Sequence, residues 1–314
     1  MDEVGASRDQ ATRPKRFEHL KEEQMAEIKS KDVGAIDVMQ YPFTPEHIER
    51  WYGSYEMNLM INTLLKHVPR EAFTQGNCSV EEFIRRMDEA GVDKVFICAC
   101  KFYSYTRKEM GFSWTNEDVY KLIKGHQDRL IGIAGYNPFK IKQSLEELEI
   151  AVKEWGFKGV YGHFMSFGVA PNDRRMYPLY AKAGELGIPV SMQLGHGMEL
   201  YPNECGRPIY LDEVALDFPE TKFVGSHTGW PWTEEMEAMA WKHPNVYVDI
   251  AGHNPQYLAP NIINFMNTRG ADKTLFGSNG WPWKMLFDQI DKLGLKEKSL
   301  KKVLRENALK LYKL

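Results

Sequence analysis

The chain has 314 residues, a formal net charge of −3 and 43% hydrophobic residues, which fits one large α/β domain or two small ones. The near-neutral charge gives no electrostatic reason to expect nucleic acid or an anionic membrane surface as a partner. No apolar run is long enough to span a bilayer, and no apolar signal segment is found near residue 1.

The four cysteines are sparse and irregularly spaced, which favours reduced thiols and a cytoplasmic location; they are Cys78, Cys98, Cys100 and Cys205. The first 33 residues are charged and lack an apolar stripe. We interpret residues 1–33 as an extension in which Arg13 to Lys31 forms a surface helix, a partner-binding arm or a partly ordered segment. Residues 34–314 are expected to form a single domain.

From Ala35 onward, short apolar runs alternate with longer segments of helical spacing. The predicted strands are Ala35–Met39, Lys94–Ala99, Leu130–Ala134, Gly159–Tyr161, Pro189–Leu194, Lys222–Gly225, Val246–Ile250 and Thr274–Phe276. The predicted helices are Val80–Ala90, Asn116–Gly125, Ser144–Trp155, Pro178–Leu186, Leu211–Phe218, Glu234–Lys242, Pro260–Asn267 and Met285–Leu293. Eight such units predict an α/β fold of the (β/α)8, TIM-like barrel type. A doubly wound open sheet is the alternative, but no GxGxxG motif follows the first strand.

Two inserts interrupt this regular spacing. One runs from Tyr41 to Asn77 after the first strand, and the other runs from Gly197 to Ile209 after the fifth. Loops that follow barrel strands lie on the C-terminal face, where barrel enzymes place their active sites. The inserts are therefore expected either to cap a substrate pocket or to form a dimer interface.

Polar residues stand where several predicted strands end, and they should converge on the barrel mouth. These residues include Tyr41, His163, Gln193, His196, His227 and Asn279. Together with the last predicted helix, Glu306–Tyr312, these strand ends resemble those of the amidohydrolase superfamily. The resemblance covers residues 35–314 and points to the branch of the aminocarboxymuconate-semialdehyde-decarboxylase-like enzymes.

The resemblance also locates the positions at which that family binds metal. They correspond here to Met39, Tyr41, Gln193, His227 and Asn279, where the family has His-x-His, His, His and Asp. Only His227 keeps the family residue, so the chain is similar to a subgroup in which most metal ligands are replaced. No metal ligand and no cofactor are therefore expected. The alternative is zinc or another divalent metal bound by His163, His196 and His227.

Without a metal, the side chains themselves must handle a substrate carbonyl group. His227 could polarise a carbonyl or exchange a proton, while Gln193 and Asn279 could stabilise an oxyanion through amide donors. Tyr41 could add a hydroxyl group, and His163 and His196 are further acid–base candidates. A purely structural hydrogen bond is the alternative role for each histidine.

The predicted substrate-binding residues are Met39, Tyr103, Arg174, Trp230, Trp232 and Trp281. Arg174 would pair with a carboxylate or phosphate, although a surface charge at a helix start is the alternative. Tyr103, in the segment after strand two, would stack on an aromatic acid or lie in a solvated loop. The two Trp-Pro-Trp segments would wall an apolar pocket or bury a homodimer interface.

The resemblance implies an enzyme that acts on a small-molecule substrate. We expect a metal-independent hydrolase or carbon–carbon lyase of a small, aromatic carbonyl or carboxylate compound, of the lactone or β-keto thioester type. One alternative is a metal-dependent decarboxylase of the aminocarboxymuconate-semialdehyde type. Another is a barrel that binds a ligand without catalysis. A solid mouth, filled by the tryptophan-rich loops, would favour this last alternative.

Overall fold

The computed structural model describes residues 27–63 and 76–314. An eight-stranded sheet forms its centre, and all of its paired strands are parallel. In spatial order the strands are β1 (Ala35–Gln40), β2 (Val92–Cys98), β5 (Leu130–Gly135), β6 (Val160–Gly162), β7 (Val190–Gln193), β8 (Phe223–Ser226), β9 (Val246–Asp249) and β10 (Thr274–Leu275). The Val38 N–H donates to the Phe276 carbonyl at 3.0 Å, and the Asn279 N–H donates to the Met39 carbonyl at 2.8 Å. These bonds close the sheet, so the predicted barrel is confirmed.

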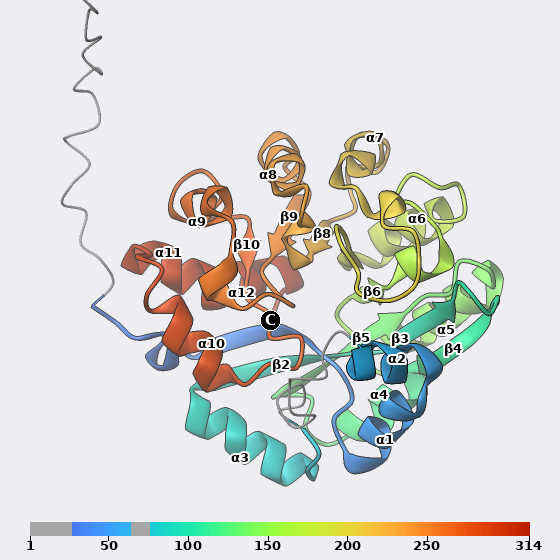
Figure 1. Cartoon of the computed structure of the whole chain (residues 1–314), viewed down its shortest axis with the longest axis horizontal. Helices are drawn as coiled ribbons and strands as arrows, with labels where there is room; N and C mark the ends of the chain where they lie inside the picture. Colours follow the sequence, from blue (N-terminus) through green and yellow to red (C-terminus); the bar gives the residue numbers. More distant parts are fainter. Residues whose placement is uncertain (1–26, 64–75) are drawn as a thin grey trace, which may run out of the picture.

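Helices surround the barrel and connect its successive strands (Figure 1). They are α3 (Val80–Ala90), α4 (Asn116–Ile123), α5 (Ile141–Lys153), α6 (Tyr177–Leu186), α7 (Leu211–Asp217), α8 (Thr233–Lys242), α9 (Pro260–Asn267) and α10 (Trp283–Ile290). The chain ends in α11 (Glu297–Lys301), a π-helical segment (Lys302–Glu306) and α12 (Asn307–Tyr312). Short 3₁₀ helices lie at Ser30–Asp32, Phe164–Phe167, Glu204–Gly206, Pro208–Tyr210, His227–Gly229 and Pro255–Tyr257.

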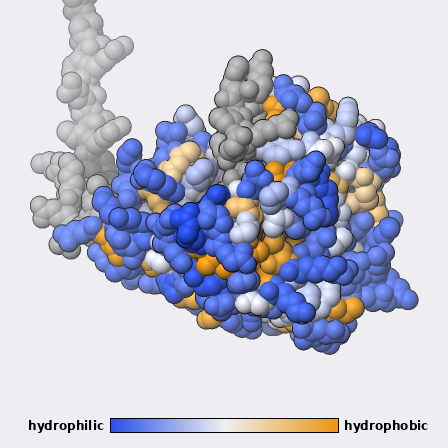
Figure 2. All heavy atoms as spheres, turned by 90° about the horizontal axis from the view of Figure 1, so that it is seen from below, coloured by the Kyte–Doolittle hydropathy of each residue, from blue (hydrophilic) through white to orange (hydrophobic). Residues whose placement is uncertain are grey.

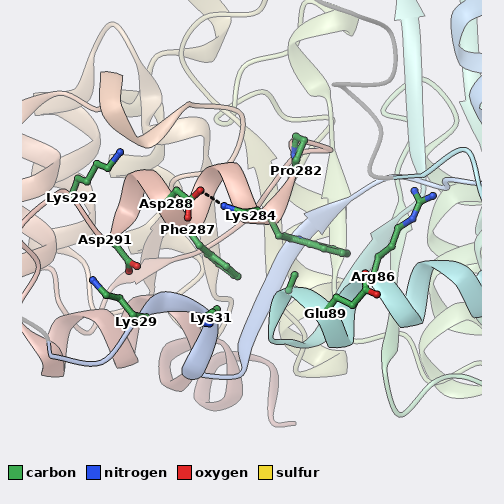
Figure 3. A pocket seen from close by; sticks show the side chains of 12 residues that line it. Lys29, Lys31, Arg86, Glu89, Pro282, Lys284, Phe287, Asp288, Asp291 and Lys292 are labelled. Carbon is green, nitrogen blue, oxygen red and sulfur yellow. Dashed lines mark hydrogen bonds and ion pairs between the residues drawn. The ribbon is translucent and has the colours of Figure 1, made fainter.

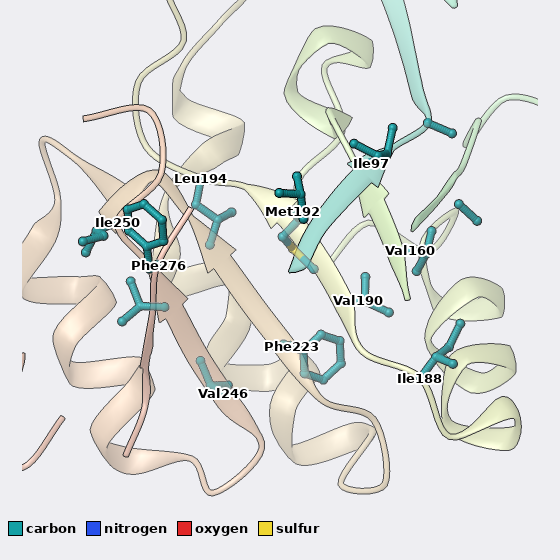
Figure 4. Close-up of a cluster of buried hydrophobic side chains, with 14 of the residues drawn as sticks. Ile97, Val160, Ile188, Val190, Met192, Leu194, Phe223, Val246, Ile250 and Phe276 are labelled. Atoms are coloured by element: carbon teal, nitrogen blue, oxygen red, sulfur yellow. The ribbon is translucent and has the colours of Figure 1, made fainter. Parts of the chain in front are cut away.

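Alternation along the strands divides the apolar residues between two cores. In β8, Phe223 belongs to the outer core between sheet and helices, whereas Val224 belongs to the core inside the barrel. Figure 4 shows part of the outer core, in which side chains from adjacent strands pack on one another. On the inside, Tyr312 of α12 packs edge to face on Phe96 of β2, with ring centroids 4.5 Å apart. The final helix thus contributes to the interior core of the barrel.

The charged extension joins the barrel before β1. Both the N–H and the hydroxyl of Ser30 donate to Asp291, at 2.9 and 2.6 Å. At the end of α3, Gly91 adopts φ 74°, and a Cβ there would lie 1.8 Å from the Lys31 carbonyl oxygen. Only glycine can therefore occupy position 91, where the end of α3 packs against the backbone of Lys31. Most of the predicted Arg13–Lys31 segment lies outside the described residues.

Three excursions lie on the loops that follow barrel strands. The first carries α1 (Pro45–Gly53) and α2 (Tyr55–Thr63). The second is an antiparallel hairpin, β3 (Cys100–Ser104) and β4 (Glu109–Trp114), in a segment for which we predict no strands. The period-two burial of β3, with Phe102 inside and Tyr103 half-buried, stabilises this hairpin against the barrel mouth. The third excursion, at residues 197–209, contains two of the 3₁₀ helices.

The surface mixes polar and apolar groups. Figure 2 shows a mostly hydrophilic face, with an apolar patch near its centre. Within residues 27–63 and 76–314, no helix combines the length and apolar character required to cross a bilayer.

The buried carboxylate of Asp37 stabilises the seam at which the barrel closes. It accepts hydrogen bonds from the N–H groups of Met39 (3.0 Å) and Ser278 (2.8 Å) and from the indole N–H of Trp283 (2.8 Å). Desolvation raises the pKa of Asp37 above its ordinary value, although these donors oppose the shift. The side chain thus joins β1 to the segment after β10.

We expect Asp37→Ala to lower the free energy of unfolding by about 3–5 kcal/mol, because three buried donors lose their acceptor. Urea denaturation would measure this loss. The matched control is Asp128→Ala, at an exposed position, which should change stability by less than about 0.5 kcal/mol. Equal stability of the two variants would contradict the structural role of Asp37.

Candidate functional site

A cavity of about 460 Å³ opens at the C-terminal ends of the barrel strands. Its lining includes an apolar part from the excursions and a polar part from strand ends. The residues that line it are Tyr41, Trp51, Met57, Met60, Cys100, Phe102, Phe112, His163, Gln193, His196, Gly197, Met198, Glu199, His227, Trp230, Gly252, His253, Tyr257 and Asn279. All six predicted catalytic residues therefore lie around one space.

A larger cavity of about 930 Å³ lies outside the barrel, between α3 and α10 (Figure 3). Lysines and acidic residues line it, and Lys284 and Asp288 pair with each other at 2.6 Å. Trp283 lies in its wall, but the indole N–H of this residue is already bonded to Asp37. None of the polar strand-end residues reaches this cavity. The mouth cavity is therefore the candidate site.

Hydrogen bonds to its backbone fix the position of His227. Its φ is 70°, in the left-handed region, and its N–H donates to Asp249 at 3.0 Å. Its carbonyl accepts a hydrogen bond from Nε2 of His253 at 2.9 Å. Such a backbone is strained for a residue other than glycine and is typical of functional sites. The imidazole is thereby fixed at the cavity wall.

The His227 ring is neutral at physiological pH. Burial, followed by the nearby His253 and His163, lowers its pKa to about 3. Its Nδ1 atom is buried and has no hydrogen-bond partner among the described residues. A neutral ring with a free nitrogen can accept or donate a hydrogen bond to a ligand. The ring is therefore better suited to a hydrogen bond with a substrate than to taking up a proton near pH 7.

Asn279 presents a second polar atom without a partner. Its φ is 52°, and its N–H donates to the Met39 carbonyl at 2.8 Å. The side-chain oxygen is buried and has no partner in the described part of the chain. Gln193, only 6% exposed, uses its amide nitrogen to contact the Tyr201 hydroxyl at 3.3 Å. Both amides therefore face the cavity with hydrogen-bonding capacity left for a ligand.

The third excursion supplies two residues that the sequence pattern does not identify. The Tyr201 hydroxyl donates to Glu199 at 2.9 Å and lies 3.4 Å from Nε2 of His163. Glu199 is in turn 4.0 Å from the same His163 nitrogen. Burial lowers the pKa of His163, while Glu199 opposes the shift. The position of Glu199 in the predicted pocket-capping insert is the signal that could have drawn attention to it.

Aromatic rings and thioethers form the remaining wall. Tyr41 packs against Trp114, with ring centroids 5.2 Å apart, and against Trp51 at 6.2 Å. Phe102 and Phe112 stack at 5.4 Å. Burial raises the pKa of Tyr41 well above its ordinary value, so its phenol stays neutral. A flat apolar ligand would be complementary to this side of the cavity.

The predicted substrate-binding residues divide into two groups. Trp230 lines the cavity. The other five are absent from its described lining; they are Met39, Tyr103, Arg174, Trp232 and Trp281. Met39 is buried and accepts a contact from the Cys98 thiol at 3.8 Å. Tyr103 stacks on Phe167 instead, with centroids 5.4 Å apart.

Arg174 and Trp232 also lie away from the mouth cavity. The side chain of Arg174 is exposed beyond β6. The ring of Trp232 lies 5.6 Å from the guanidinium group of Arg207. Both residues follow a strand along the chain, but their loops carry them away from the barrel axis.

The family positions for metal ligands hold an unsuitable donor set. A thioether, a phenol and two amides replace four of the ligands that the resemblance implies, and one imidazole remains; such a donor set is not that of a zinc site. In the described ranges, no group of three His, Cys, Asp or Glu side chains is arranged to hold a metal ion. His196 is exposed, with Nδ1 2.7 Å from the Asn203 amide nitrogen. In the described residues, His163, His196 and His227 do not form a group arranged to hold a metal ion.

Comparison with known proteins gives a family and a fold. The model of the family described as amidohydrolase matches residues 108–314. An uncharacterized TIM-barrel protein from Bordetella bronchiseptica is 24% identical, with a TM-score of 0.69 over 88% of this chain and 98% of that chain. A search of curated proteins returned no match.

Two decarboxylases share the fold. The 5-carboxyvanillate decarboxylase of Novosphingobium aromaticivorans, complexed with manganese, is 16% identical, with a TM-score of 0.64 over 89% of this chain and 96% of that chain. The 2,6-dihydroxybenzoate decarboxylase from Rhizobium is 13% identical, with a TM-score of 0.64 over 89% and 98%. The family match confirms the predicted resemblance to the amidohydrolase superfamily, and the solved structures confirm the barrel fold.

The Asp249 carboxyl generates a pH-dependent stability. Burial raises its pKa to about 6, so the folded state binds this proton more tightly than the unfolded state does. Stability from this group is full below pH ~4 and is lost as the pH rises through about 6. Relative to Asp249→Asn, the wild-type protein should gain about 2 kcal/mol of unfolding free energy between pH 7.5 and 4.5. Denaturation series at both pH values would measure this gain, and a constant difference would contradict the assignment.

Because most side chains at the family's metal positions are poor zinc ligands, the metal content of the purified protein tests whether an ion binds there. We expect protein purified without chelator or added metal to hold far less than one equivalent of zinc or manganese by elemental analysis. Its melting temperature should not change after EDTA treatment and buffer exchange, because no ion would tie the strand ends together. A near-stoichiometric metal whose removal lowers the melting temperature would refute this expectation.

Proposed function

Since the chain belongs to the amidohydrolase family, we propose that it is a metal-independent hydrolase or carbon–carbon lyase of a small aromatic carbonyl or carboxyl compound. Membership of the family makes the protein an enzyme of the hydrolase or carbon–carbon lyase type. The metal-independent reaction of an aromatic carbonyl compound is supported by one observation: Gln193, His227 and Asn279 converge on one cavity with an aromatic wall.

The wall fixes the kind of molecule that fits. Phe102, Phe112 and Trp51 offer ring faces and edges, and Met57 and Met60 offer thioethers that adapt to a ligand surface. A space of about 460 Å³ suits a single aromatic ring with short substituents. The ring of the substrate would lie against this wall, with its carbonyl group toward the polar strand ends.

The strand ends would stabilise negative charge on the carbonyl oxygen. The amides of Gln193 and Asn279 and the phenol of Tyr41 are neutral groups held by a rigid barrel. Fixed neutral donors that face a developing oxyanion lower its energy without reorganisation. The neutral His227 ring would add a further hydrogen bond at the same point.

Glu199 of the third excursion and His163 after β6 would transfer protons. Glu199 and His163 lie 4.0 Å apart, and Tyr201 contacts both of them. A carboxylate and a buried neutral imidazole can exchange a proton through a hydroxyl group or a water molecule. We therefore assign the acid–base role to Glu199 and His163, with Tyr201 as a positioning residue.

Two reactions fit this arrangement. Hydrolysis of an aryl lactone or a β-keto thioester would use the oxyanion contacts directly. Decarboxylation of an aromatic acid is the second candidate, favoured by the carboxyvanillate and dihydroxybenzoate decarboxylases that share the fold. The tryptophan-rich loops leave the cavity open, which does not favour the alternative of a filled, non-catalytic barrel. A homodimer that buries exposed mouth residues such as Trp230 stays a proposal.

Chelator-treated enzyme should be assayed against aryl lactones, aryl β-keto thioesters and hydroxybenzoates, with and without added manganese. We expect turnover of at least one class without metal. His227→Ala should lower kcat/KM about 100-fold or more, because one oxyanion contact is lost. His126→Ala, whose side chain lies outside the cavity lining, is the matched control and should leave kcat/KM unchanged. Turnover that strictly requires manganese would overturn the metal-independent mechanism.

A further inference from the structure

Glu56 on α2 carries a buried carboxylate without a partner. The residue is 4% exposed, and neither carboxylate oxygen has a hydrogen-bond partner among the described residues. A glycine faces it on β4, since a Cβ at Gly111 would lie 2.7 Å from Oε2 of Glu56. An unpaired buried carboxylate is costly, so its retention points to a partner that is bound from outside.

The Glu56 side chain lies in the wall of a small cavity of its own. The space is about 200 Å³, and its other walls are largely apolar, with Leu59, Met60, Met198 and Leu200 among them. Met60, Met198 and Glu199 line both this space and the mouth cavity. The small cavity is therefore adjacent to the candidate active site.

The charges around both spaces have one sign. No lysine or arginine belongs to the described lining of either cavity, whereas Glu199 belongs to both and Glu56 to the smaller one. With no lysine or arginine in the described lining of the small cavity to offset them, Glu56 and Glu199 favour a cation over an anion there. Hard metal ions keep a shell of oxygen ligands that includes several waters, whereas the alkyl and thioether walls of this cavity favour an organic cation.

We propose that the small cavity is a subsite for a primary ammonium group, with Glu56 as its main counter-charge. The substrate would then be an aromatic carbonyl compound with a short, amine-bearing side chain. Its ring would occupy the mouth cavity and its ammonium group the smaller one. The naming of this molecule as a substrate rests on the proposed function; the subsite itself does not.

Isothermal titration with three probes of similar size tests the subsite: 2-phenylethylamine, 2-phenylethanol and 3-phenylpropionate. Wild-type protein should bind the amine at least ten-fold more tightly than the alcohol, and the carboxylate most weakly. Glu56→Gln should remove the preference for the amine but leave alcohol binding within two-fold of wild type. Glu49→Gln, an exposed glutamate on the neighbouring helix, is the matched control and should keep the preference.

Two further measurements separate the subsite from folding and from catalysis. Glu56→Gln should melt no lower than wild type, because it removes an unpaired buried charge. Should it fail to fold, Gly111→Ala tests the same subsite, since its Cβ would displace the carboxylate and reduce the preference at least five-fold. An amine that binds no better than the alcohol, or a preference that survives in the variants, overturns the proposal. Amine binding without turnover of any substrate class would instead count against the proposed function alone.

Discussion

The carboxylate of Asp37 is the constraint on which the mouth of the barrel depends. It accepts three N–H donors from both sides of the seam between β1 and β10. Tyr41 and Asn279, which follow these strands, are positioned by that seam. Asp249 has the same role across the barrel, where it accepts the N–H of His227 and the hydroxyl of Ser226. The two buried carboxylates thus serve geometry, and the side chains that they position are neutral.

That neutrality separates this site from the metal sites implied by the family. Burial favours the neutral form of three titratable groups at the mouth: it lowers the pKa of His227 and His163 and raises that of Tyr41. In the proposed metal-independent mechanism, the dipoles of several neutral side chains would stabilise the charge that a metal ion stabilises in those sites. Two further carboxylates, Glu199 and Glu56, lie on the excursions and line the small cavity. Under the proposed function, the barrel would bind the carbonyl group and the excursions would select the substrate.

The sequence predicts the barrel and much of its polar centre because both follow from local regularities. Strand periodicity identifies the strand ends, and closure of the sheet then brings Gln193, His227 and Asn279 together. The same reasoning does not identify Glu199 or the hairpin β3–β4, because both lie in excursions outside the repeating strand–helix units. Arg174 is predicted to bind substrate because it follows a strand, but the sequence does not define how far the loop extends from the barrel axis, and the side chain is exposed. Met39 packs in the interior core, where the register of β1 is irregular between Asp37 and Gln40.

The left-handed backbone at Asn279 has a consequence for the history of this barrel. Asparagine and aspartate are the residues, after glycine, that adopt positive φ at least cost. The φ of 52° at this position therefore accommodates the aspartate of a metal-binding relative as readily as the amide found here. An ancestor could have exchanged one chemistry for the other by single side-chain replacements on an unaltered scaffold, and laboratory evolution could retrace that route.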